Sequence, residues 1–147
     1  MAATFTFYNS FAEYLGDGTF DLNSDTIKVA LVSSSYTFAA THTVWADASA
    51  NEVSNAGYTA GGATLSVSYN RSSNVLTFDA TDTAWTASGS SLVARRAVIY
   101  KSGTANSRTN PLIASVLLDN TPADVTVTAG NTLTLQWNGS GIFTVTV

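Results

Sequence analysis

Hydrophobic and polar residues alternate one by one along much of the chain. Between Thr26 and Val32, the side chains of Ile27, Val29 and Leu31 fall on one side of an extended backbone. The same alternation, with Thr or Ser filling the other side, recurs over residues 63–69, 74–79, 124–128, 132–137 and 143–147. Such a period of two is typical of a β-strand with one buried and one wet face. Thr on the wet face favours strands further.

Two stretches are apolar on both faces. Residues 92–100 and 112–118 are therefore predicted to be central strands that are covered on both sides. Arg95 and Arg96 interrupt the first stretch. In a regular strand they point to opposite faces, so one of them is expected to face inward unless a bulge redirects it.

Polar turn sequences separate the predicted strands. Residues 70–73, 129–131 and 138–141 are each expected to close a hairpin, and the last contains the Asn-Gly pair that favours tight turns. Gly61 and Gly62 precede a predicted strand and are free to adopt positive φ. They are interpreted as backbone punctuation, because the surrounding spacing matches no phosphate-binding loop.

Three other segments complete the expected architecture. A short helix is predicted to begin near Asn9 or Ser10 and to stop at Gly16. Residues 34–62 lack clear periodicity and are expected to form a long crossover loop with short local structure that packs on the domain. Residues 1–8 form an apolar, strand-like N-terminal arm. The arm either pairs within its own sheet or reaches into a neighbouring subunit.

These elements predict an all-β fold. About eight to ten strands with hairpin turns and no β–α–β alternation favour a β-sandwich or jelly-roll-like antiparallel fold with one short N-terminal helix. The chain has 147 residues, which fits a single β domain spanning residues 1–147.

Charge narrows the classes of partner. Only 11% of residues are charged, the net charge is −4, and the six Lys and Arg residues form no basic stripe. Nucleic acid and anionic membrane surfaces both attract clustered cations, so neither is expected as a partner. The chain contains no apolar run of 18 residues, and its first eight residues do not resemble a signal peptide. Synthesis in the cytoplasm of a host cell is therefore expected.

The sequence offers little for catalysis. It contains no cysteine and one histidine, His42, which is expected to be an exposed loop side chain. A catalytic triad and a His- or Cys-based metal site are thus both unexpected. Asp79 with Asp82, and Asp21 with Asp25, allow either a glycosidase-like carboxylate pair or simple turn caps. We expect caps, no enzyme, and no catalytic, metal or cofactor residue.

Aromatic residues near loops and in the arm are the candidates for binding. On a surface with few charges, Trp, Tyr and Phe are the usual anchors of protein interfaces. Stacking on sugars and simple coverage of the core are the alternatives for the tryptophans. The predicted interface residues are Phe5, Phe7, Tyr8, Trp45, Tyr58 and Trp85.

Several short motifs occur in a particular order along the chain. They are the stretch 21–31 (DLNSDTIKVAL), Asn-Glu-Val at 51–53, the run 57–62 (GYTAGG), Phe-Asp-Ala-Thr-Asp at 78–82 followed by Trp85, 97–100 (AVIY) and 111–113 (PLI). In this order the chain resembles a family of small virion proteins of tailed bacteriophages. The resemblance spans most of the chain.

The resemblance implies a function. Comparable phage proteins are often head decoration, or cement, proteins, which are jelly-roll-like, commonly trimeric, and clamp neighbouring major capsid subunits from outside. It therefore implies a virion protein that binds the major capsid protein, forms a homotrimer and stabilises the head without catalysis. The family is also associated with tails and fibres. The alternative is thus a tail or fibre-associated domain that binds glycans on the host surface.

Overall fold

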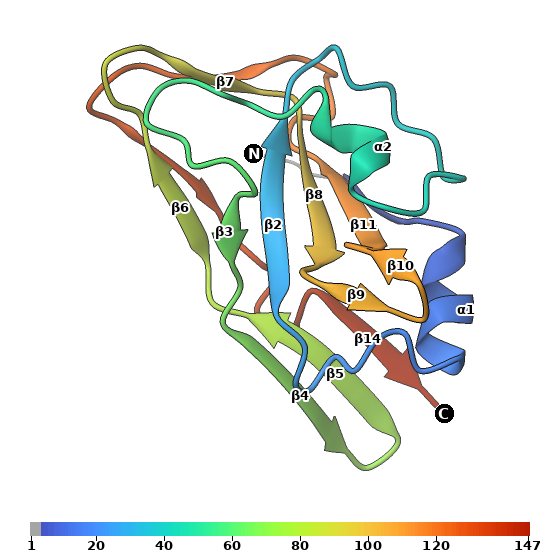
Figure 1. The fold of residues 1–147 in the computed structure, drawn as a ribbon. Coiled ribbons are helices and arrows are strands. Elements are labelled where there is room, and N and C mark those ends of the chain that lie inside the picture. Colours follow the sequence, from blue (N-terminus) through green and yellow to red (C-terminus); the bar gives the residue numbers. More distant parts are fainter. Residues whose placement is uncertain (1–3) are drawn as a thin grey trace.

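Antiparallel β-strands dominate the structure, a computed structural model that describes residues 4–147 (Figure 1). Strands contain 42% of the residues and helices 8%, which confirms the predicted mostly β, antiparallel fold. Within residues 4–147 the sheets do not close into a barrel.

The largest sheet has five strands. Their order across the sheet is β1 (Thr4–Phe7), β11 (Leu112–Leu117), β8 (Arg96–Lys101), β2 (Ile27–Val32) and β3 (Ala63–Thr64). All neighbouring strands are antiparallel. As predicted from their apolar character on both faces, β8 and β11 lie inside the sheet.

The remaining strands form smaller sheets. A three-stranded sheet contains β14 (Phe143–Thr146), β5 (Val75–Ala80) and β4 (Val67–Ser72), in that order. The two-stranded pairs are β6 (Thr83–Thr86) with β13 (Thr132–Leu135), β7 (Leu92–Ala94) with β12 (Val125–Val127), and β9 (Thr104–Ala105) with β10 (Arg108–Thr109). The helices are α1 (Ser10–Gly16) and α2 (Ala46–Ser49).

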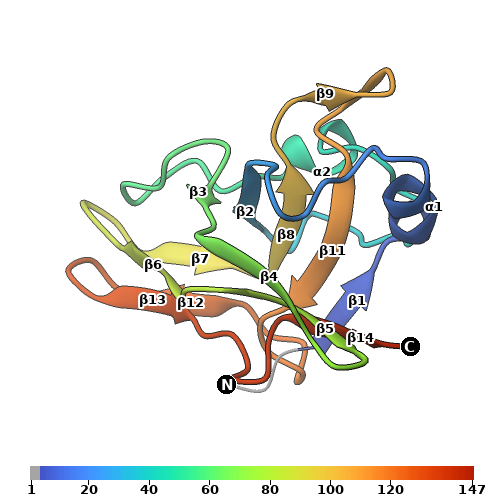
Figure 2. The same cartoon turned by 90° about the horizontal axis from the view of Figure 1, so that it is seen from below.

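The five-stranded sheet is covered on both faces (Figure 2). On one face, Ile27, Val29 and Leu31 of β2 pack in the main core, to which the smaller sheets contribute Phe78 and Leu133. Each large aliphatic side chain buried in this way stabilises the fold by roughly 1.5–3 kcal/mol before conformational entropy is counted. The alternation seen in the sequence thus corresponds to a buried face.

A second, smaller core lies on the other face of the sheet. It contains Val32 of β2 and Tyr100 of β8, and it is closed by Tyr36 and Trp45 from the segment between β2 and β3. This segment also contains α2, a helix that the sequence pattern does not predict. Because α2 has only four residues, it offers too few turns for a helical period to be recognised.

The N-terminal arm pairs within its own sheet. Residues Thr4–Phe7 form β1, an edge strand in antiparallel register with β11. The first three residues of the arm lie outside the described residues. For the described part, the structure thus decides between the two arrangements that the sequence leaves open.

Only one of the three predicted hairpins forms. β4 and β5 pair with each other across a tight turn in which Ser73 adopts a φ of 53°. The hairpins expected at 129–131 and 138–141 are wrong, because β12, β13 and β14 pair with β7, β6 and β5, respectively. The residues at 129–131 and 138–141 still turn the chain, but the strands that follow them pair with strands from other parts of the sequence, where their apolar faces are buried.

The adjacent arginines mark a break between strands. β7 ends at Ala94 and β8 begins at Arg96, so Arg95 belongs to neither ladder. Both arginines are half-buried: Arg95 pairs with Asp124 at 2.7 Å, and the guanidinium of Arg96 lies 5.0 Å from the ring centre of Phe38. Arg96 shares a face of β8 with Val98 and Tyr100 of the second core, and its Nη1 donates to the buried Ser115 hydroxyl at 3.4 Å. One arginine thus faces inward, as expected, while the break at Arg95 directs the other to Asp124.

Gly61 and Gly62 both have positive φ, 86° and 71°, as predicted. At Gly62 a Cβ atom would lie 2.0 Å from the carbonyl oxygen of Val29. Only glycine fits this approach of the chain to β2.

Candidate protein interface

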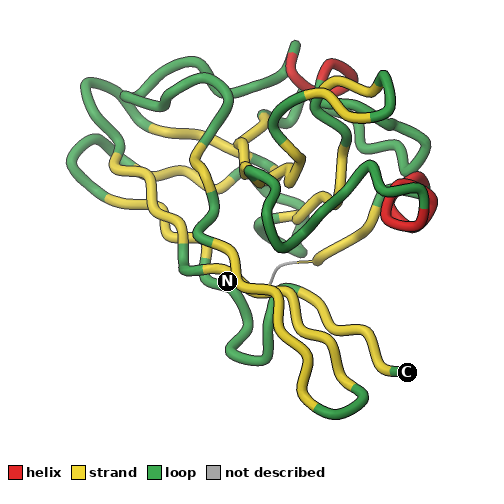
Figure 3. The backbone as a smooth tube through the Cα atoms, turned by 60° about the horizontal axis from the view of Figure 1, so that its bottom comes forward, coloured by secondary structure: helices red, strands yellow, loops and turns green. Residues whose placement is uncertain are grey.

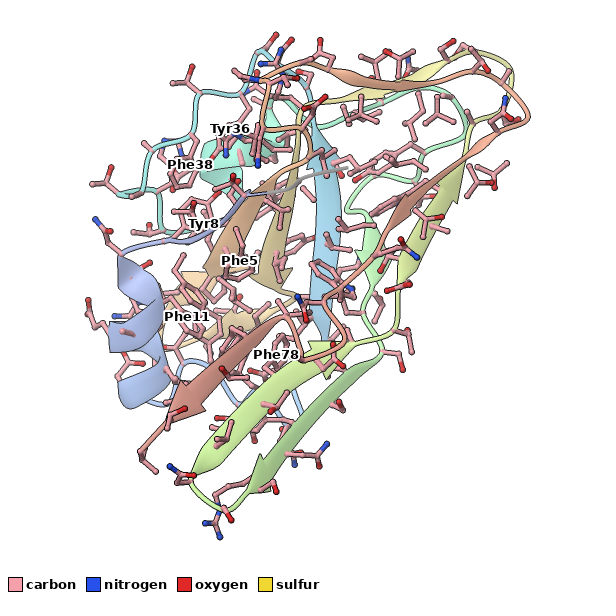
Figure 4. All side chains as sticks on the ribbon, turned by 180° about the vertical axis from the view of Figure 1, so that it is seen from behind. Phe5, Tyr8, Phe11, Tyr36, Phe38 and Phe78 are labelled. Carbon is pink, nitrogen blue, oxygen red and sulfur yellow. The ribbon has the colours of Figure 1, made fainter. Side chains whose placement is uncertain are left out.

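A cluster of phenylalanines joins the N-terminal elements to the three-stranded sheet. This phenylalanine cluster consists of Phe5 and Phe7 of β1, Phe11 of α1, Phe78 of β5 and Phe143 of β14. Phe7 stacks on Phe11 with ring centres 4.7 Å apart and meets Phe143 edge to face at 5.2 Å. Phe143 in turn stacks on Phe78 at 5.0 Å. Figure 4 shows Phe5, Phe11 and Phe78 converging from these different elements.

The outer side of this cluster is open to solvent. Phe78 is fully buried, whereas Phe7 retains 37% exposure. Val145, two residues beyond Phe143 on the same face of β14, retains 41%. Phe7 and Val145, linked by the half-buried Phe143, form a partly exposed apolar strip along β1 and β14, the β1–β14 strip.

Two of the predicted interface residues, Tyr58 and Trp85, line a single groove. Its volume is about 230 Å³, and its walls come from the loop before β3 and from β6. Both side chains are half-buried. The two aromatics are 27 residues apart in the sequence, and only the tertiary structure brings them to the same surface.

The Tyr58 hydroxyl is already engaged inside the protein. It accepts a hydrogen bond from the Leu31 N–H and donates one to Oε1 of Glu52, each at 2.9 Å. Glu52 also accepts from the Gly61 N–H at 2.6 Å. Burial is the largest cause that raises the pKa of Tyr58 well above its usual range. The nearby Glu52 carboxylate raises it further, because ionisation would place a second negative charge beside it. Only the ring of Tyr58 is therefore available to a partner.

The other two predicted interface residues, Tyr8 and Trp45, lie in the interior. Tyr8 is 1% exposed, and its hydroxyl lies 2.9 Å from that of Tyr36 (Figure 4). Trp45 is 7% exposed and stacks in parallel on Tyr100 with ring centres 5.0 Å apart. Both complete the second core and offer little surface to a partner.

His42 is half-buried, so the expected exposed position is wrong. Its Nδ1 lies 2.8 Å from the Tyr36 hydroxyl, which extends the Tyr8–Tyr36 contact into a chain of hydrogen-bonding groups. The loop that carries His42 folds back on the five-stranded sheet, and this fold-back is not visible in the local sequence.

The aspartate pairs act on the backbone. Asp21 accepts from the Asn23 N–H and the Ser24 hydroxyl, as expected for a turn cap. Asp25 accepts from the Asp21 N–H and forms an ion pair with Lys101 at 2.7 Å. In the second pair, Asp79 accepts from the Ala80 N–H, while Asp82 accepts from the Trp137 N–H across the structure.

Most cationic groups are engaged with other parts of the protein. Arg108 illustrates this: it pairs with Asp17 at 2.9 Å and lies 4.1 Å above the ring centre of Tyr14. Arg71, near the tip of the β4–β5 hairpin, is exposed and donates to the Ser73 carbonyl.

Among residues 4–147, no cluster of three or more His, Cys, Asp or Glu side chains has the arrangement of a metal site. In the same part of the chain, none of the helices has the length and apolar character that crossing a membrane requires.

Phe143 and Val145 were not predicted as interface residues. Their alternation with threonines identified them as one face of a strand, and such a face is normally buried. Periodicity defines a face but does not reveal whether another element covers it. A usable signal was nevertheless present: residues 125–147 contain no charged side chain, although they include an edge strand.

Compared with known proteins, the chain matches no family model, no curated protein and no solved structure.

Proposed function

We propose that this chain is a non-enzymatic structural protein of a tailed bacteriophage particle, which decorates the head by binding the major capsid protein. The single observation that best supports the proposal is the β1–β14 strip, where Phe7 and Val145 expose apolar surface beside a rigid aromatic cluster. Exposed aromatic anchors on a rigid scaffold are typical of protein interfaces. The identity of the partner rests on the resemblance in the sequence.

Binding of this kind stabilises the partner by mass action, because the protein adds to folded shells and not to dissociated subunits. The polar, low-charge surface and the cysteine-free sequence suit a particle coat outside the reducing cytoplasm. The homotrimer that the resemblance implies is part of this proposal, with each protomer contributing the same surface.

The test uses phage heads assembled without this protein. Purified chain is added to the heads, and bound protein is measured by sedimentation and mass spectrometry, followed by the melting temperature of the heads. We expect saturation at a fixed ratio to the capsid subunits and a higher melting temperature. Heads that take up no protein, or whose melting is unchanged at saturation, would falsify the head assignment.

A matched pair of variants locates the surface. Phe7→Ala removes the exposed ring from the β1–β14 strip, whereas Val93→Ala alters an equally exposed side chain on β7 (37% against 36%). We expect Phe7→Ala to weaken head binding by about 1–3 kcal/mol, as for an interface anchor, and Val93→Ala to leave it unchanged. Circular dichroism confirms that both variants are folded.

The alternative is a tail or fibre-associated domain that binds host glycans. The groove that contains Tyr58 and Trp85 supports it, because aromatic rings beside hydroxyl-bearing side chains stack on sugars. Trp85→Ala should then abolish binding of the fluorescently labelled protein to host cells and leave head binding intact. Electron microscopy of particles labelled through this chain separates the two placements on the virion.

A further inference from the structure

We infer that β14 is the contact through which two copies of this chain associate, by extending the three-stranded sheet across a two-fold axis. The inference concerns the isolated protein and does not require the proposed capsid contact. Its two-fold symmetry differs from the homotrimer that the resemblance implies, so the measured oligomeric state decides between the two.

The three-stranded sheet projects from the body of the molecule, and β14 is one of its edges (Figure 3). Thr144, Val145 and Thr146 are all exposed. The register pairs Thr144 with Thr77 and Thr146 with Val75 of β5. The Val147 N–H donates to the carbonyl of Asn74, the residue just before β5. Backbone groups of an antiparallel strand point alternately to its two sides, so those of every second residue, counted from Val147, point towards β5. The backbone N–H and C=O groups of Thr144 and Thr146 therefore point away from the sheet.

This edge lacks the usual protection against pairing. Natural edge strands are blocked by charged side chains, proline, bulges or a covering loop. β14 contains only Phe, Thr and Val, and its register with β5 runs without a shift from Phe143 to Thr146. The open edge is therefore competent to accept another strand.

A second copy of β14 complements this edge. In the proposed pair, two copies of β14 lie antiparallel with the two-fold axis at Val145. Thr144 of each copy then lies opposite Thr146 of the other, and the two residues exchange N–H to C=O hydrogen bonds. The two Val145 side chains then meet across the axis in a non-hydrogen-bonded pair. Residues 125–147 contain no charged side chain, so the contact brings no like-charged side chains together despite the net charge of −4. A two-fold contact requires a surface patch that is complementary to itself, and the open edge of β14 meets this requirement.

The absence of cysteine from the chain makes a direct test possible. In the proposed pair, the Cα atoms of the two residues at position 145 are about 4.5 Å apart. This separation lies within the range of about 4.4–6.8 Å that a disulfide spans. Val145→Cys should therefore form a covalent dimer under mild oxidation.

Ser72→Cys is the matched control. Ser72 lies on the opposite edge of the same sheet, in the same cross-strand row as Val75 and Thr146, and is likewise exposed. At micromolar protein we expect Val145→Cys to cross-link at least about tenfold faster than Ser72→Cys, because prior pairing raises the local concentration of the second thiol. Equal rates for the two variants would overturn the inference.

Sedimentation of uncross-linked protein supplies an independent measurement. The wild-type chain should shift from monomer towards dimer as its concentration rises, and Thr146→Pro should abolish the shift. Proline there removes an outward N–H without removing a bond to β5. A thermal melt verifies that Thr146→Pro is folded, and Thr146→Lys replaces it if it is not. A wild-type chain that stays monomeric or forms only trimers contradicts the inference. So does a folded Thr146→Pro or Thr146→Lys variant that dimerises as strongly as the wild type.

Discussion

At the scale of single residues, three tyrosine hydroxyls are hydrogen-bonded inside the protein. Tyr8 and Tyr36 share a hydrogen bond in the second core, and Tyr58 bridges Leu31 and Glu52 beside the main sheet. Burial raises the pKa of all three hydroxyls above the ordinary value of 10.0. In the folded protein the neutral phenol is thus strongly preferred, whereas the unfolded chain ionises normally.

This difference predicts sensitivity to alkali. Below about pH 10 both states keep the phenols neutral and stability is fully retained. As the pH rises further, the unfolded state loses protons that the folded state retains, so the free energy of unfolding falls. Urea denaturation between about pH 8 and pH 11 should record a decline in that free energy, together with a shallower decline for Tyr58→Phe.

Tyr58→Phe should also be less stable than the wild type at pH 8, where the phenol is neutral. Tyr58→Phe leaves the Leu31 N–H and the Glu52 carboxylate without this partner, so we expect it to lose about 1–3 kcal/mol of stability at pH 8. Wild-type stability that stays constant up to pH 11, or an unchanged slope in Tyr58→Phe, contradicts this account of the buried hydroxyls.

At the scale of elements, Arg108 anchors the β9–β10 hairpin to the chain around α1. Its guanidinium stacks on Tyr14 of α1, and its Nη1 donates to Asp17 at 2.9 Å and to Thr19 at 3.0 Å. The planar fork of arginine serves all of these contacts at once, whereas an ammonium group does not. Charge alone is therefore insufficient at this position.

Arg108→Lys should accordingly lower the melting temperature nearly as much as Arg108→Ala does. Arg71→Lys is the control, because Arg71 lies near an exposed hairpin tip with a single bond to the Ser73 carbonyl. Differential scanning calorimetry makes the comparison. Full rescue of stability by lysine at position 108 would show that the stacking and fork geometry contribute nothing.

Element pairing was the least predictable part of the fold. The turn at residues 138–141 has the composition of a hairpin, yet it connects β13 to β14, which lie in different sheets. Gly141 there has a φ of 105°, and a Cβ would approach Thr77 within 2.6 Å. The glycine therefore permits the chain to cross closely over β5 before it pairs with that strand.

At the scale of the whole molecule, the three-stranded sheet projects from the body of the protein (Figure 3). Arg71 is the exposed cation of this sheet, whereas Lys28, Arg95, Arg96, Lys101 and Arg108 are all half-buried. Proteases cut where the backbone is exposed and opens locally at little cost.

Limited digestion with trypsin should therefore cut first after Arg71 and release fragments 1–71 and 72–147. Mass spectrometry of the earliest products identifies the site, and Arg71→Gln should delay digestion of the intact chain. An initial cut after Arg108, in the β9–β10 hairpin, would instead identify that hairpin as the least stable part.

The sequence by itself determined the class of the fold: strand alternation predicted the antiparallel sheets, and the doubly apolar stretches located β8 and β11 inside the largest sheet. Both are local properties, because a period of two follows from the geometry of an extended chain.

Only the tertiary structure decided which strands pair, and which apolar side chains remain exposed. Tyr8 and Trp45 are buried while Phe7 and Val145 are open, although all four belong to similarly apolar stretches. Coverage of a side chain depends on elements far away in the sequence: the segment with α2 covers the second core, whereas in the described chain nothing covers the outer part of β14. Local alternation carries no information about such distant partners, since it specifies a face and not what packs against it.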